Sequence, residues 1–117
     1  MEKGYKNLIV WQKSKTLAVE RYKVTEKFPK SETYGIVLQM KRAAVSIPSN
    51  IAEGYRRKHD KEKIQFLRIA FGSGAELETQ IEVSKEIFGN EKLDFTKIDS
   101  ILEEIMKMLN KLINYSV

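Results

Sequence analysis

Cysteine is absent from this chain of 117 residues, and proline and histidine are rare, with two prolines and one histidine. The lack of cysteine excludes a disulfide scaffold, a thiol nucleophile and a cysteine-ligated metal. Long hydrophobic runs are missing too. The longest is Leu8–Trp11, whereas a signal-peptide core needs about 7–15 residues and a membrane span about 20. We therefore expect a cytoplasmic protein with no membrane association.

The residue patterns of common enzyme classes are also absent. A di-iron bundle needs two Glu-x-x-His motifs, and a serine protease triad would have to use His59, the single histidine, in a highly charged segment. There is no phosphate-binding loop and no dinucleotide-binding fingerprint. Carboxylates such as Glu53, Glu76 and Glu78 leave an acidic site open as an alternative, although glutamates of this kind are usually solvated or ion-paired. We predict no enzymatic activity, no cofactor and no metal.

The composition that remains is that of a soluble globular domain, with 42% hydrophobic and 32% charged residues, and the length fits one domain over residues 1–117. The formal net charge of +5 is unevenly distributed. Residues 1–63 hold 15 lysines and arginines against 7 acidic residues, a net charge of +8, whereas residues 64–117 hold 6 against 9. A basic first half favours an acidic partner such as nucleic acid, or a self-complementary assembly.

Hydrophobic residues recur every three or four positions, and no segment alternates as a β-strand does. This pattern predicts four helices, with Asp60 as the N-cap of the third. Their expected ranges are Leu8–Lys27, Ser31–Arg57, Asp60–Phe88, and a fourth from Asp94 or Thr96 to Asn114. Four amphipathic helices with short links are typical of an all-α, antiparallel up-down four-helix bundle.

Proline and glycine refine the second and third helices. Pro48 interrupts no hydrophobic pattern, which predicts one proline-kinked helix rather than two short ones. Gly72 and Gly74 would each weaken an isolated helix by about 1 kcal/mol, so we expect them to permit close approach between helices. Residues 1–7 are expected to fray. The apolar stripe expected for the first helix is Leu8, Trp11, Ala18, Tyr22 and Thr25.

A polar stripe follows one side of the predicted second helix. Its side chains, spaced three or four residues apart, share about a fifth of the helix circumference, and they are Gln39, Arg42, Ser46, Asn50, Glu53 and Arg57. The third helix repeats the pattern with Gln65, Arg68, Gly72, Glu76 and Thr79. A solvated face is one interpretation. The other is a semi-buried contact such as a subunit interface, because short hydrogen-bonding groups can satisfy one another there.

A basic cluster lies where the second and third predicted helices meet. Five lysines and arginines fall within nine residues: Arg56, Arg57, Lys58, Lys61 and Lys63. Such a cluster can contact phosphates without reading sequence, although a basic turn can also be merely solvated.

The second helix carries a motif that resembles a known family. The run QMKRAAVSIPSNIAEG over Gln39–Gly54, followed by Arg57, is similar to the signature of the four-helix-bundle proteins encoded by intervening sequences in 23S ribosomal RNA genes. Val10–Lys13, Phe28–Pro29 and Phe66–Ser73 with Glu76–Glu78 add to the resemblance, which is strong over residues 8–88.

The resemblance implies a four-helix bundle that assembles into a homopentamer and is not an enzyme. It also suggests a relationship to the accessory variability determinant of diversity-generating retroelements, which implies RNA or DNA and a reverse transcriptase as partners. We therefore expect a non-catalytic, oligomeric nucleic-acid-binding accessory protein. The alternative is a homo-oligomeric protein-interaction scaffold with no direct role in nucleic-acid binding.

Overall fold

Four α-helices make up most of the computed structural model, which describes residues 4–89 and 93–115. The helices are α1 (Ile9–Thr25), α2 (Ile36–Tyr55), α3 (Asp60–Ile87) and α4 (Thr96–Tyr115), with short 3-10 turns at η1 (Gly4–Asn7) and η2 (Lys30–Glu32). Over these two ranges there is no β-strand. The all-α, four-helix fold predicted from the sequence is confirmed.

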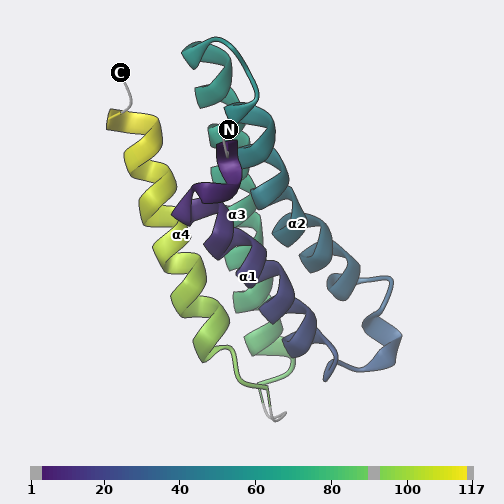
Figure 1. Ribbon diagram of the computed structural model, residues 1–117. Helices are drawn as coiled ribbons and strands as arrows, with labels where there is room; N and C mark the ends of the chain where they lie inside the picture. Colours follow the sequence, from purple (N-terminus) through teal and green to yellow (C-terminus); the bar gives the residue numbers. More distant parts are fainter. Residues whose placement is uncertain (1–3, 90–92, 116–117) are drawn as a thin grey trace.

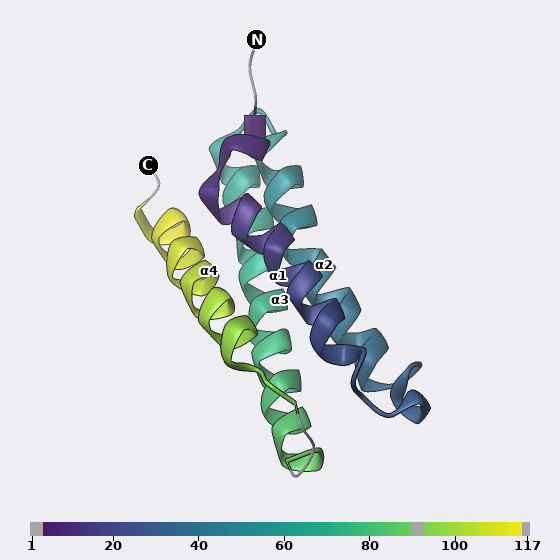
Figure 2. The same ribbon diagram turned by 60° about the horizontal axis from the view of Figure 1, so that its bottom comes forward.

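The helices lie side by side along a body of 46 × 27 × 22 Å (Figure 1). Helices α2 and α3 share the most extensive contact, α1 packs on α2 and α4, and α4 also packs on α3. Figure 2 shows the same arrangement from a second direction, with α4 and α2 at opposite sides of the bundle. The link between α1 and α2 and the link between α2 and α3 lie at opposite ends of the molecule.

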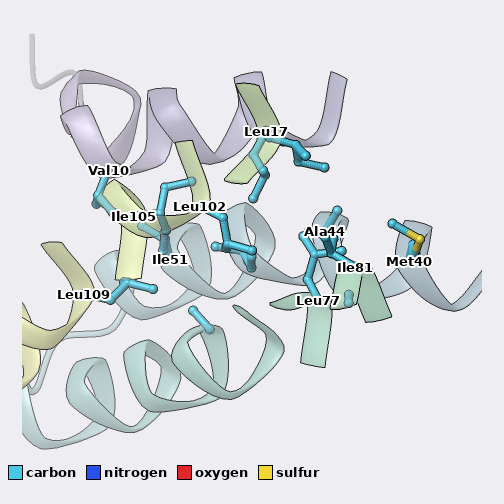
Figure 3. Packing of buried hydrophobic residues seen from close by; sticks show 14 of the residues in the cluster. Val10, Leu17, Met40, Ala44, Ile51, Leu77, Ile81, Leu102, Ile105 and Leu109 are labelled. Atoms are coloured by element: carbon cyan, nitrogen blue, oxygen red, sulfur yellow. The ribbon is translucent and has the colours of Figure 1, made fainter. Parts of the chain in front are cut away.

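The space between the four helices is filled by aliphatic side chains (Figure 3). Each helix contributes fully buried residues, which include Leu17, Met40, Ile47, Ile51, Leu67, Leu77, Ile81, Ile98, Ile105 and Leu109. Burying one such side chain stabilises the fold by about 1.5–3 kcal/mol. Phe28, in the link after α1, closes one end of this core against Phe88 and Phe95, with ring centroids 5.0 and 6.3 Å away.

The apolar stripe predicted for α1 is confirmed in part, because Thr25 is buried and Leu8, Trp11 and Ala18 pack against the core half-buried. The buried residues of α1 are Val10, Ser14, Leu17, Arg21 and Thr25, whereas Tyr22 is 56% exposed. Three of the five buried residues are polar, and two of these, Ser14 and Arg21, lay outside the predicted stripe because a hydrophobic pattern does not include such residues. Ser14 satisfies its hydroxyl by donating to the carbonyl of Val10 at 2.6 Å.

The start of α2 was also predicted wrongly, at Ser31 instead of Ile36. The intervening residues form η2, and Gly35 then leaves the helical region with φ −103° and ψ −116°. Helix α2 continues through Pro48 to Tyr55, so a single second helix is confirmed, while the kink stays a prediction. At the next helix, His59 is the N-cap with extended backbone, and Asp60, expected to be the cap, is the first helical residue.

The two central glycines of α3 differ in their surroundings. A Cβ at Gly74 would meet the Met106 side chain of α4, so close helix approach is confirmed there. A Cβ at Gly72 would meet nothing within 4 Å in this chain, so the same expectation was wrong for Gly72.

Polar contacts fix the start of α4. The side chain of Asp94 accepts a hydrogen bond from the backbone N–H of Thr96 at 2.9 Å, and this bond lowers the pKa of Asp94. Lys85 of α3 donates to Asp99 at 2.7 Å and to Glu82 at 3.2 Å. The bond to Asp99 is the main reason that the pKa of Lys85 is raised. Among the described helices, none is both long and apolar enough to cross a bilayer.

Substituting Gly54 tests the close packing of α2 on α3. A Cβ there would lie 3.0 Å from the carbonyl oxygen of Lys63 and 3.1 Å from Cβ of Phe66. Alanine favours a helix by about 1 kcal/mol over glycine, yet we expect Gly54→Ala to lower the free energy of unfolding by about 1–3 kcal/mol, since backbone must shift. Urea denaturation at fixed protein concentration measures this. The exposed Ser100→Ala should stay within about 0.5 kcal/mol of wild type, and a stabilised Gly54→Ala would show that the helices are not in tight contact.

Candidate nucleic-acid interface

The basic cluster is presented by a short turn at one end of the bundle. Helix α2 ends at Tyr55 and α3 begins at Asp60. The turn is closed by backbone hydrogen bonds from Arg56 N–H to the carbonyl of Glu53 at 3.2 Å and from Arg57 N–H to the carbonyl of Gly54 at 3.1 Å. The five predicted basic residues therefore lie around one helix junction, as the sequence indicated.

Two of the five are engaged inside the chain. Arg57 forms an ion pair with Glu53, one turn earlier in α2, and its guanidinium lies 3.9 Å from Glu62. The same guanidinium lies 4.7 Å from the centroid of the Phe66 ring. Glu53 and Arg57, which the sequence placed on one stripe, thus neutralise each other.

Lys63 is held in a similar way. Its ammonium lies 3.5 Å from the carboxylate of Asp60 and 5.0 Å from the centroid of the Tyr55 ring. The lysine is half-buried, so its ammonium is less accessible than that of an exposed lysine.

The remaining three residues keep their charge available. Arg56, Lys58 and Lys61 are exposed, and no ion pair is formed by any of them with the described part of the chain. Arg56 stacks on Tyr5 of η1, with 5.4 Å between its guanidinium carbon and the ring centroid. Stacking restrains a guanidinium while leaving its N–H edge free to donate.

The part played by η1 was not predicted from the sequence, because residues 1–7 were expected to fray. Gly4–Asn7 form an ordered turn in which Tyr5 packs on Trp11, with ring centroids 5.3 Å apart, and Gln12 donates to the Lys6 carbonyl at 2.9 Å. The turn places the ring of Tyr5 against the guanidinium of Arg56. Lys6 of the same turn is exposed. Aromatic residues six positions apart were the only signal for this packing.

The polar stripe of α2 lies against α3. Near its centre, the hydroxyls of Ser46 and Ser73 are hydrogen-bonded across the two helices at 2.7 Å. Asn50 donates to the Ser46 hydroxyl at 2.9 Å and to the Ser46 carbonyl at 2.8 Å. This part of the stripe is a semi-buried contact within one chain. The Ser46 hydroxyl therefore contributes to the contact between the two helices.

Further along, the stripe borders two adjoining hollows of about 350 and 490 Å³. Gln39, Glu76 and Gln80 line both of them, and Arg42 lines the smaller one. The side-chain oxygen of Gln80 is buried there without a hydrogen-bond partner. Arg68, predicted as part of the same set, is exposed and lies outside both linings.

The comparisons with known proteins decide the family. A family model described as 23S rRNA-intervening sequence protein matches residues 6–111. This chain belongs to that family. No curated protein matches it.

A solved structure supports the fold of this family member. The crystal structure of a protein of unknown function from the S23 ribosomal protein family of Bacteroides thetaiotaomicron VPI-5482, at 1.70 Å resolution, is 24% identical. The similarity covers 91% of this chain and 99% of that chain, with a TM-score of 0.77. At this identity the likeness shows the fold alone.

The serine pair offers a test of the polar stripe. Ser46→Ala leaves the buried Ser73 hydroxyl without this partner, so we expect the free energy of unfolding to fall by about 1–3 kcal/mol. Replacing both serines by alanine should cost less than the sum of the single changes. Urea denaturation measures both, and Ser49→Ala, exposed in the same helix, is the matched control. Additive losses would mean that the two hydroxyls do not interact.

Proposed function

We propose that this member of the 23S rRNA-intervening sequence protein family is a non-catalytic, oligomeric accessory protein that binds the phosphate backbone of RNA or DNA. The main support is the turn between α2 and α3, where Arg56, Lys58 and Lys61 are exposed and have no carboxylate partner in the described residues. Contacts of this kind position a protein on nucleic acid without reading its sequence.

Assembly would multiply this basic surface. The outer face of α3 exposes Ile69, Val83 and Ile87, which are 48%, 42% and 62% exposed. They lie at helical spacing along the side of α3 that carries Glu76 and the unpartnered Gln80 oxygen. A second copy covering this face would bury the three apolar side chains and could supply a donor to Gln80. A pentamer, which the family resemblance implies, would carry a formal charge of +25, five times that of one chain.

Nucleic-acid binding is tested by its salt dependence. For the wild type, we expect the dissociation constants for a labelled single-stranded RNA and a DNA duplex to rise steeply with salt. Log affinity falls as log salt rises, and each lost phosphate contact makes this negative slope shallower by about 0.7–0.9. Replacing Arg56, Lys58 and Lys61 by alanine should therefore flatten the slope by about 2 or more, equally for all sequences. Fluorescence anisotropy between about 50 and 200 mM salt measures this.

A matched triple variant controls for the total charge. Replacing Lys97, Lys107 and Lys111 of α4 by alanine removes the same charge from another face and should leave the slope unchanged. Conversely, Glu53→Gln should tighten binding, because it releases Arg57 from its ion pair. Equal slopes for the two triple variants would place the binding surface elsewhere. No binding by the wild type at about 50 mM salt would contradict the proposal and favour the protein-interaction scaffold.

The assembly has its own test. We expect light scattering at micromolar concentration to give a mass several times the 13.6 kDa of one chain. The double variant Val83→Lys/Ile87→Lys should fall to the monomer mass while keeping its helical circular dichroism, because both residues are exposed. Ile9→Lys/Val19→Lys, at exposed positions of α1, adds the same charge and should leave the mass unchanged. A wild-type mass of one chain would refute the assembly.

A further inference from the structure

Arg21 is a buried arginine without a carboxylate. It lies in α1 with 6% of its surface exposed, and none of the ion pairs in the described part of the chain includes it. One guanidinium nitrogen, Nη1, donates to the Thr25 hydroxyl at 3.1 Å, while Nε is buried with no partner. Burial lowers the pKa of Arg21, but a guanidinium still keeps its charge at neutral pH. A buried charge of this kind is costly unless an anion meets it.

The guanidinium belongs to the wall of a pocket. This pocket, of about 320 Å³, lies between the end of α1, the link after it and the start of α2. Its apolar lining comes from Val37, Leu38 and the ring of Tyr22, and Tyr34 of the link stands at its edge, 88% exposed. Its lining residues on α2 lie near the start of that helix, whereas the basic turn follows the end of the same helix.

The charges around the pocket favour an anion. Lys41 of α2 adds an exposed ammonium to the lining, and Glu26 of the segment after α1 contributes its one carboxylate. Glu26 is exposed and is not within ion-pair distance of Arg21. The lining thus holds two cations and one acidic group, and no carboxylate pairs with the buried guanidinium of Arg21.

We propose that this pocket binds a small organic carboxylate carried on an apolar or aromatic body. The carboxylate would accept hydrogen bonds from the free N–H groups of Arg21, whose planar guanidinium can donate to both carboxylate oxygens. The body would lie on Tyr22, Val37 and Leu38. A phosphate is a poorer match, because it has no body to cover the apolar side chains of Val37 and Leu38.

Nuclear magnetic resonance with three probes tests this assignment on the full chain. We expect 3-phenylpropionate to shift the Arg21 Nε–H resonance and the amide resonances of Leu38 and Tyr34 saturably, in the millimolar range typical of a ligand of this size. The neutral isostere 3-phenylpropanamide and inorganic phosphate should produce no saturable shift at these resonances. If the amide binds as tightly as the acid, or phosphate alone gives the same shifts, the carboxylate assignment is wrong. No saturable shift with any probe also overturns it.

Variants separate binding from folding. Arg21→Met should weaken 3-phenylpropionate binding tenfold or more, since it removes the charge-assisted hydrogen bonds. It should still fold, because replacing a buried charge by an apolar side chain of similar volume is often neutral or stabilising. Arg42→Met, on α2 outside the pocket, should bind as the wild type does. If Arg21→Met fails to fold, Lys41→Met provides a second test at an exposed position. It removes the other cation of the lining, so it should also weaken 3-phenylpropionate binding. Unchanged affinity in a folded Arg21→Met, or in Lys41→Met, contradicts the proposal.

Discussion

The close approach of α2 and α3 is the constraint on which the rest of this bundle depends. The two helices leave no room for a Cβ at Gly54, and the hydroxyls of Ser46 and Ser73 meet between them. Small residues at these points let the backbones come together, so the core on the inner side can be covered by α1 and α4 (Figure 3). A tightly packed helix pair also fixes the turn that joins it, and hence the direction of every basic side chain on that turn.

Electrostatics at the turn follow from the same geometry. Because α2 continues to Tyr55, Glu53 lies one turn before Arg57 and pairs with it. Because α3 begins at Asp60, Glu62 lies close to the same guanidinium. Exposed ion pairs contribute at most about 1 kcal/mol each to the free energy of unfolding. These pairs therefore affect the distribution of charge on the turn more than the stability of the fold. They neutralise the charge of Arg57 and leave the charges of Arg56, Lys58 and Lys61 without a carboxylate partner in the described residues.

Much of the fold could be predicted from the sequence, since proline, glycine and the three-to-four-residue spacing bound the helices to within a few residues. The start of α2 was missed because Gly35 ends the η2 segment with a backbone geometry that periodicity does not reveal. The inward face of α1 was predicted only in part, because the polar residues Ser14 and Arg21 are buried on it. For the candidate site, the sequence indicated the cluster, but the pairing of Arg57 and the stacking of Arg56 on Tyr5 depend on how separate segments meet.

Buried polar side chains in this bundle are of two kinds. Those with a hydrogen-bond partner belong to the packing of the helices, and those without one indicate where a functional site is to be sought. Ser14 and Ser84 are fully buried, and each donates a hydrogen bond inside the chain. Across the described ranges, two buried side-chain atoms have no partner, Nε of Arg21 and Oε1 of Gln80. Both residues line a hollow that opens beside α2. An unmet buried polar group costs about 1–3 kcal/mol, and such departures from local rules are expected at functional sites. The hydrophobic core cluster includes neither Arg21 nor Gln80, so each can gain a partner without repacking that cluster.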